Sequence, residues 1–149
     1  MLSAFMSLLV NGTAIFILIL TILMLVTATI NLFYRVPYVP SKMRVVKKMV
    51  EVAKLKKGDI VYDLGCGDGR LLLEAEKNKE VETRGYEAAP IPFLLAHLKK
   101  LFHHSRMKIY PSNFIKANLS DANVIFCYLG PETMTELSNK LKKECRKGT

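Results

Sequence analysis

Carboxylates and glycines lie close together in the segment Val61–Arg70, which reads VYDLGCGDGR. Its candidate site residues are Asp63, Gly65, Cys66, Gly67, Asp68 and Gly69. Glycines allow a sharp turn of the backbone and a close approach of a ligand to the main chain. A helix that follows such a turn offers N–H groups without partners inside the helix. The segment therefore predicts a small-molecule site at the end of a buried strand.

The charge of this segment separates two classes of cofactor. A dinucleotide site has the pattern GxGxxG, with the pyrophosphate at the helix N-terminus. Here Arg70 takes the place of the third glycine, and Asp63 and Asp68 would repel a pyrophosphate. S-adenosylmethionine carries a sulfonium and an ammonium group and no phosphate. The segment therefore favours S-adenosylmethionine, and a nicotinamide-dependent oxidoreductase is the least favoured function.

A further carboxylate, Glu87, closes the next expected strand, 18 residues after Gly69. An acidic residue at this place can accept hydrogen bonds from the ribose hydroxyls of an adenosine. Taken alone, Glu87 would more simply be a capping or surface acid, but its interval from the glycine turn favours the ribose role. We expect Cys66 to be a small packing residue of the turn and not a nucleophile.

These residues resemble motif I of the class I S-adenosylmethionine-dependent methyltransferases, and Gly85–Glu87 resembles the acidic end of their second strand. The stretches PYVPS, KMVEVAKLKKGDIVYDLGCGDGR and RGYEAAPI are similar to the small membrane-anchored protein-lysine methyltransferases. That group includes mitochondrial enzymes that modify the ATP synthase c subunit and the adenine nucleotide translocase, and it has prokaryotic relatives. The resemblance extends from about Pro37 to the C-terminus.

The resemblance implies a role for individual positions. Asp63 and the glycines of the turn would line the methionine part of the cofactor, and Glu87 would hold the ribose. Asn113 and Phe114 follow the third expected strand, where relatives contact the adenine. Many relatives have Asp at the position of Asn113, and an amide can also hydrogen-bond an adenine edge. No catalytic residue is identified; Tyr128 either positions a substrate amine or packs as an aromatic residue.

Alternating short strands and helices are expected to position these residues. We predict strands at 60–64, 81–87, 107–110 and 122–129, and helices after Ser41, at 71–79, at 91–102 and from Pro131 onward. This alternation favours an α/β fold with a parallel sheet, and the resemblance implies the Rossmann-like methyltransferase sheet. Ser41 is expected to be an N-cap. Residues 37–41 are equally well a plain linker or a loop near the cofactor.

Two of the expected helices have an apolar face that should pack on the sheet. In the helix at 91–102 the expected core residues are Phe93, Leu94, Leu98, Leu101 and Phe102. In the last helix the expected inner residues are Leu137, Leu141 and Cys145.

The family sheet has seven strands, whereas only four are found in this sequence. We therefore expect residues 58–149 to be a partial methyltransferase domain, truncated after the fourth strand and its helix. The apolar fourth strand, VIFCYL at 124–129, would then lie at an exposed edge, where such strands are unfavourable. On this basis we expect the family function but doubt that the chain performs it alone.

The first 34 residues contain no charged side chain. A span of about 11–34 has the roughly 20 residues that a membrane helix needs, with Phe33 and Tyr34 at the interface. No Lys or Arg precedes the long apolar run, which favours an uncleaved anchor over a signal peptide. Residues 1–34 are thus interpreted as one N-terminal transmembrane helix.

The basic residues follow this leader directly. The linker and helix at 35–57 contain eight Lys or Arg and one Glu, net +7, whereas residues 58–149 contain 14 basic and 12 acidic residues, net +2. Positive flanks stay on the cytoplasmic side of a membrane, or on the matrix side in an organelle. Such a cluster favours anionic lipid, and a nucleic-acid partner is disfavoured because no separate basic face remains.

The sequence does not predict a metal site. The three cysteines are widely spaced, and His97, His103 and His104 have no ligand partners nearby. The favoured function is S-adenosylmethionine-dependent methylation of protein lysine at a membrane, with a membrane protein as one expected substrate. The alternatives are a small-molecule or lipid methyltransferase that uses the same cofactor site, and a non-catalytic membrane-anchored cofactor-binding fragment.

Overall fold

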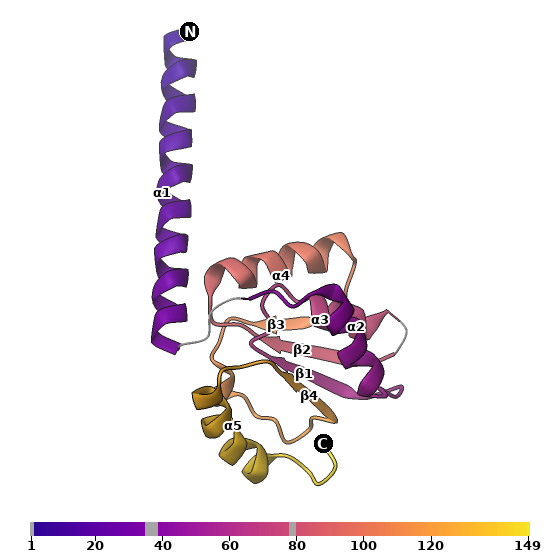
Figure 1. Cartoon of the computed structure of the whole chain (residues 1–149). Coiled ribbons are helices and arrows are strands. Elements are labelled where there is room, and N and C mark those ends of the chain that lie inside the picture. The colour runs from indigo at the N-terminus through magenta and orange to yellow at the C-terminus, as the bar shows by residue number, and fades with distance from the viewer. Residues whose placement is uncertain (1, 35–38, 78–79) are drawn as a thin grey trace.

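The computed structural model describes residues 2–34, 39–77 and 80–149 (Figure 1). A long helix, α1 (Leu2–Tyr34), precedes an α/β domain. The domain elements are α2 (Met43–Val52), β1 (Ile60–Leu64), α3 (Arg70–Glu76), β2 (Glu82–Tyr86), α4 (Pro90–Phe102), β3 (Lys108–Tyr110), the 3-10 helix η1 (Phe114–Lys116), β4 (Val124–Cys127) and α5 (Pro131–Glu144). Every expected strand and helix is present, with ends shifted by a few residues.

Some expectations fall outside the described residues. These are Arg35 of the basic segment, Pro37 and Tyr38 of the linker, the last two residues of the helix expected at 71–79, and the side chains of Phe33 and Tyr34.

The four strands form one parallel sheet in the order β3-β2-β1-β4. The chain moves outward from β1 to β2 and β3 and then returns to the other side of β1 with β4. In open α/β sheets, ligands bind at the carboxyl ends of the strands where the order reverses in this way. The predicted α/β class and parallel sheet are confirmed, and β4 lies at an edge of this sheet.

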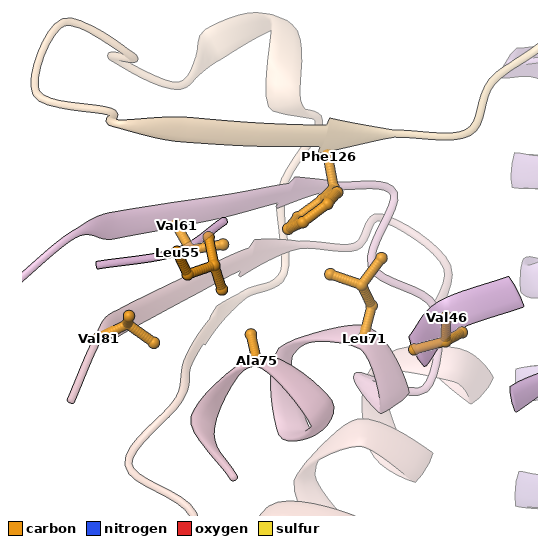
Figure 2. Packing of buried hydrophobic residues seen from close by; sticks show 7 residues of the cluster. All are labelled: Val46, Leu55, Val61, Leu71, Ala75, Val81 and Phe126. Atoms are coloured by element: carbon orange, nitrogen blue, oxygen red, sulfur yellow. The ribbon is translucent and has the colours of Figure 1, made fainter. Parts of the chain in front are cut away.

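Apolar residues pack against both faces of the sheet and fix β1 between them. Figure 2 shows the cluster on the face of α2 and α3, formed by Val46, Leu55, Val61, Leu71, Ala75, Val81 and Phe126. On the other face a second cluster contains Tyr62, Leu64, Ala117, Leu119, Ala122 and Leu137. Leu137 is fully buried and Leu141 and Cys145 pack beside it, which confirms the inner face of α5.

The helix after the linker begins one residue later than a Ser41 cap requires. Its N-cap residue is Lys42, whose side chain makes no capping hydrogen bond, so the expected Ser41 cap is wrong. The Ser41 carbonyl instead accepts a hydrogen bond from Arg70 Nη1 at 2.8 Å. Ser41 therefore contacts the residue that follows the glycine turn, through its carbonyl, and its side chain does not cap α2.

The expected core face of α4 is wrong for most of its residues. Leu94, Leu98, Leu101 and Phe102 are exposed, whereas Phe93 packs against a buried cluster that includes Ala96 and Met107. Pro92 is buried as well. The physical reason is close approach: a Cβ added at Gly69 would lie 3.4 Å from Ala96 Cβ, so only short side chains fit where α4 crosses the turn.

Helix α1 is a single uncharged helix of 33 residues. By length and composition alone, its stretch Met6–Leu32 is sufficient to cross a membrane. Near its C-terminal end it contacts the first turn of α4, where Thr27 Oγ1 accepts a hydrogen bond from the Ile91 N–H at 3.3 Å. Helix α1 is therefore docked on the domain that follows it.

Candidate functional site

A pocket of about 650 Å³ opens at the carboxyl ends of the parallel strands. Eight of the nine predicted site residues line it: Asp63, Gly65, Cys66, Gly67, Asp68, Glu87, Asn113 and Phe114. They come from the ends of β1, β2 and β3, which the sheet places side by side. The volume lies within the range of about 300–1,000 Å³ that is common for small-molecule sites.

Gly69 does not line this pocket. Its φ is +74°, in the left-handed region that favours glycine, and a Cβ there would lie 3.2 Å from Met107 Cε. Gly69 therefore allows the turn to pack against Met107, which precedes β3, and against Ala96 of α4. Of the three glycines expected to line the methionine part of the cofactor, Gly65 and Gly67 line the pocket.

The glycine turn is held against β2 by backbone hydrogen bonds. The N–H groups of Gly65 and Cys66 donate to the Tyr86 carbonyl at 2.9 and 3.0 Å. This approach requires Gly85, because a Cβ at that position would lie 2.6 Å from Cys66 Sγ. Cys66 is buried, and burial raises the pKa of its thiol, in keeping with a packing role.

Glu87 fixes the turn and also faces the pocket. Its Oε2 accepts the Gly67 N–H at 2.9 Å, and its Oε1 accepts the Ala89 N–H at 2.8 Å. Burial raises the pKa of Glu87 even though these hydrogen bonds act to lower it. A carboxylate oxygen can accept a second hydrogen bond, so ribose hydroxyls can still donate to Glu87 while it holds Gly67.

Asp63 is a buried carboxylate of the pocket, 7% exposed, and no ion pair balances its charge among the described residues. Burial, with the negative charges of Glu87 and Asp68, raises its pKa to about 7. A positive ligand group beside Asp63 would favour the ionised form and lower this pKa. The inner end of the pocket is thus suited to a cationic group.

Asp68 also lines the pocket, but its charge is balanced inside the protein. Arg70 donates to it from Nε at 2.8 Å and from Nη2 at 2.6 Å, and Lys99 of α4 forms a second ion pair. Burial alone would raise the pKa of Asp68, but these hydrogen bonds outweigh burial and hold that pKa well below its usual range. Asp68 therefore joins the glycine turn to α4 and, through Arg70, to the linker at Ser41.

Asn113 and Phe114 form the wall beyond β2. Asn113 Oδ1 accepts the Ile115 N–H at 2.9 Å and so caps η1, which begins at Phe114. With the carbonyl oxygen used in this way, the amide NH₂ is the group of Asn113 that suits an adenine ring nitrogen. The aromatic ring of Phe114 is a suitable surface for a flat base.

The outer wall contains Tyr128, for which the sequence left two roles open; it follows β4 and is 76% exposed. The sequence did not assign the other residues of this wall, among them Thr133 and Glu136 of α5. Ile30 and Asn31 of α1 also line the pocket, for which the sequence offered no signal because the leader was interpreted only as an anchor. Of the linker, Val39, Pro40 and Ser41 line the pocket, which favours the interpretation as a loop near the cofactor.

Comparisons with known proteins find methyltransferases among the relatives of this chain. The family described as the ANTKMT methyltransferase domain matches residues 63–149. The protein-lysine N-methyltransferase of Saccharolobus islandicus (strain REY15A) is 40% identical over 117 residues, which cover 76% of this chain and 73% of that protein. The adenine nucleotide translocase lysine N-methyltransferase of Mus musculus is 30% identical over 112 residues, 74% of this chain and 48% of that protein.

A solved structure shows the same arrangement of elements. The RNA methyltransferase from Salinibacter ruber, in complex with S-adenosyl-L-homocysteine, superposes with a TM-score of 0.69 and 27% identity over 72% of each chain. The chain thus spans about three quarters of the archaeal relative and about half of the mouse one. The expected resemblance to class I methyltransferases is confirmed, and so is the expected cofactor class.

Proposed function

The chain belongs to the ANTKMT methyltransferase domain family of class I S-adenosylmethionine-dependent methyltransferases, and we propose that it methylates the side-chain amine of lysine in a protein, at a membrane. One observation carries this proposal: Asp63 and Glu87 meet in a pocket at the reversal point of the sheet, in a chain that is 40% identical to a protein-lysine N-methyltransferase.

The residues of the pocket fit S-adenosylmethionine, which when bound supplies a methyl group activated on a sulfonium. Asp63 would face the ammonium group of the methionine part, and Glu87 would accept the ribose hydroxyls. Asn113 and Phe114 would hold the adenine. From β1 to β3, the pocket residues would thus meet the methionine part, the ribose and the adenine in the order in which these parts follow one another in the cofactor.

The acceptor amine would enter on the side of β4 and α5. Tyr128 and Glu136 line the pocket there, and a carboxylate with an aromatic ring can orient a lysine side chain. The lysine amine must be deprotonated before it can accept the methyl group. We assign Tyr128 and Glu136 the role of aligning the amine, and not of removing its proton. Alignment of two reactants accounts for a large part of the catalysis of such transfers.

A membrane location is supported by α1 and by the charges that follow it. Met6–Leu32 is long and apolar enough to span a bilayer, and residues 35–57 have a net charge of +7. The positive-inside rule would place the domain on the cytoplasmic side, or on the matrix side in an organelle. Lysines of membrane proteins would then be within reach.

The first experiment is calorimetric titration of the full chain in detergent with S-adenosylhomocysteine. Glu87→Gln should weaken binding at least about tenfold, because the variant loses the charged acceptor of the pocket and loosens Gly67. The matched control is Glu80→Gln, since the Glu80 side chain is exposed and pairs only with Lys57 among the described residues. Equal binding by the Glu87 variant would contradict the assigned site.

The second experiment follows transfer of a labelled methyl group in membranes that contain candidate acceptor proteins. Label in lysine, lost when the acceptor lysine is changed to arginine, would support the proposal. Label in lipid or in a small molecule would favour the alternative methyltransferase, and tight cofactor binding without transfer would favour the non-catalytic fragment.

A further inference from the structure

The outer surface of α4 is apolar. It carries five large exposed side chains, here called the α4 ridge: Leu94, Leu95, Leu98, Leu101 and Phe102. The i, i+4, i+7 spacing of Leu94, Leu98 and Leu101 places them on one helix face, away from the buried Pro92 and Ala96. A helix on the surface of a soluble domain normally has polar side chains on that face. Contact of the α4 ridge with an apolar environment would therefore be favourable, because it would remove these side chains from water.

The position of α1 indicates what that environment is. Figure 1 shows α4 lying across the side of the domain toward which α1 extends, at a steep angle to α1. Thr27 of α1 accepts the Ile91 N–H in the first turn of α4, where helix N–H groups lack internal partners. On α1, Leu23, Ile30 and Asn31 are also partly buried. The contact between α1 and α4 therefore fixes the position of the α4 ridge along the axis of α1.

The charges of α4 suit an anionic lipid surface. The helix contains no Asp or Glu, and Lys100 lies in its last turn, whereas Lys99 of the same turn is paired with Asp68. His103 and His104 follow it and are exposed. An apolar face bordered by basic residues is the composition of helices that lie in the plane of a membrane interface, with the apolar side about 5–10 Å deep.

We propose that α4 is a second membrane-contacting element, whose ridge lies in the head-group layer beside the point where α1 enters the bilayer. This proposal rests on the membrane anchoring by α1 that is part of the proposed function. It places the end of the spanning segment near Leu23 and not at Tyr34, because the later turns of α1 pack beside α4 and line the pocket. Leu2–Leu23 still provides the roughly 20 residues that a bilayer requires.

This arrangement narrows the substrate class. With α4 in the head-group layer, the pocket lies beside the lipid surface, since Ile30 and Asn31 of α1 form part of its wall. The lysines within reach are then those in loops or helix ends at the membrane surface, and not those that project far into water.

The test uses the fact that the chain contains no tryptophan. The full chain is reconstituted in vesicles of phosphatidylcholine and phosphatidylglycerol with a single Trp in each variant. Leu98→Trp reports on the ridge, Ile19→Trp reports on α1, and Val52→Trp, at an exposed position of α2, is the matched control. Quenching is measured with lipids brominated either near the head group or near the ends of the acyl chains, and S-adenosylhomocysteine binding verifies the fold of each variant.

We expect Leu98→Trp emission to shift to shorter wavelength and to be quenched mainly by the shallow bromines. Ile19→Trp should be quenched mainly by the deep bromines, and Val52→Trp by neither. Loss of quenching at residue 98 alone would overturn the proposal and leave anchoring by α1 intact. Loss at both residues 98 and 19 would overturn the anchoring as well.

Two further outcomes would also overturn the proposal. A blue-shifted but unquenched Leu98→Trp would mean that protein, such as a second copy of the chain, covers the ridge. Equal quenching at residues 98 and 52 would mean that the domain adsorbs without a preferred face.

Discussion

At the scale of single residues, the three pocket carboxylates at the ends of β1 and β2 have different partners. Asp68 is paired with Arg70 and Lys99, and Glu87 accepts two backbone N–H groups. Asp63 is buried and is repelled by the negative charges of the other two. Its charge is therefore the one that a bound cation would stabilise most. This difference gives Asp63 a distinctive pH dependence.

We predict that Asp63→Asn makes the free protein more stable but weakens cofactor binding. The pKa of Asp63 is about 7 in the folded chain, against 3.8 for an unperturbed Asp. The stability that its neutral form contributes is complete below the unfolded pKa and is lost as the pH rises through 7. At about pH 8 the variant should be more stable by about 4 kcal/mol, and at about pH 4 the two should converge.

Chemical denaturation at the two pH values measures this difference. In the same samples, S-adenosylhomocysteine should bind wild type more tightly as the pH rises through 7, because the ionised Asp63 attracts the ammonium group, and Asp63→Asn should lose that dependence. A variant that is less stable than wild type at the higher pH would refute the assignment.

At the scale of elements, the glycine turn and β2 form one packed unit. Hydrogen bonds from Gly65 and Cys66 to Tyr86 bring the turn onto β2, and Gly85 provides the space. Leu72 of α3 also packs against Gly85, since a Cβ at Gly85 would lie 2.8 Å from Leu72 Cδ1. The shape of the site thus depends on a residue of β2 that does not line the pocket.

We predict that Gly85→Ala destabilises the domain by about 1–3 kcal/mol, the range for overpacking a dense core. The added methyl group must displace Cys66 and Leu72, which are both buried. Urea unfolding of the detergent-solubilised chain measures the effect, and cofactor affinity should fall with it because Cys66 belongs to the turn. Gly12→Ala is the matched control, as no atom lies within 4 Å of its added Cβ. An unchanged unfolding midpoint for Gly85→Ala would show that the turn does not pack as described.

At the scale of the whole molecule, α1 is part of the site and not only a leader. Its last turns pack on α4 and reach the wall of the pocket with Ile30 and Asn31. A membrane helix joined by a loose linker would leave the domain free to turn. Here the docking of α1 couples the orientation of the pocket to the direction of the helix.

We predict that Ile30→Trp weakens S-adenosylhomocysteine binding about tenfold, or about 1.4 kcal/mol, because the larger ring takes up pocket volume. Leu32→Trp, on an exposed position of the same helix, should bind like wild type. Calorimetry on both variants provides the comparison. Equal affinities would mean that the end of α1 does not sit at the pocket.

The sequence by itself determined the α/β alternation and the glycine turn, and eight of the nine site residues that it predicted line the pocket, because these features depend on local patterns at the ends of strands. Tertiary structure alone decided which carboxylates are paired inside the protein and which helix faces pack on the sheet. Asp68 is neutralised by Lys99, a residue distant in sequence, and Gly69 faces Ala96 rather than the ligand. The apolar stripe of α4 turns outward because the short Ala96 has to face the turn, and periodicity cannot distinguish a face that meets the core from one that meets something else. The contribution of Ile30 depends on the docking of two helices, which no local pattern encodes.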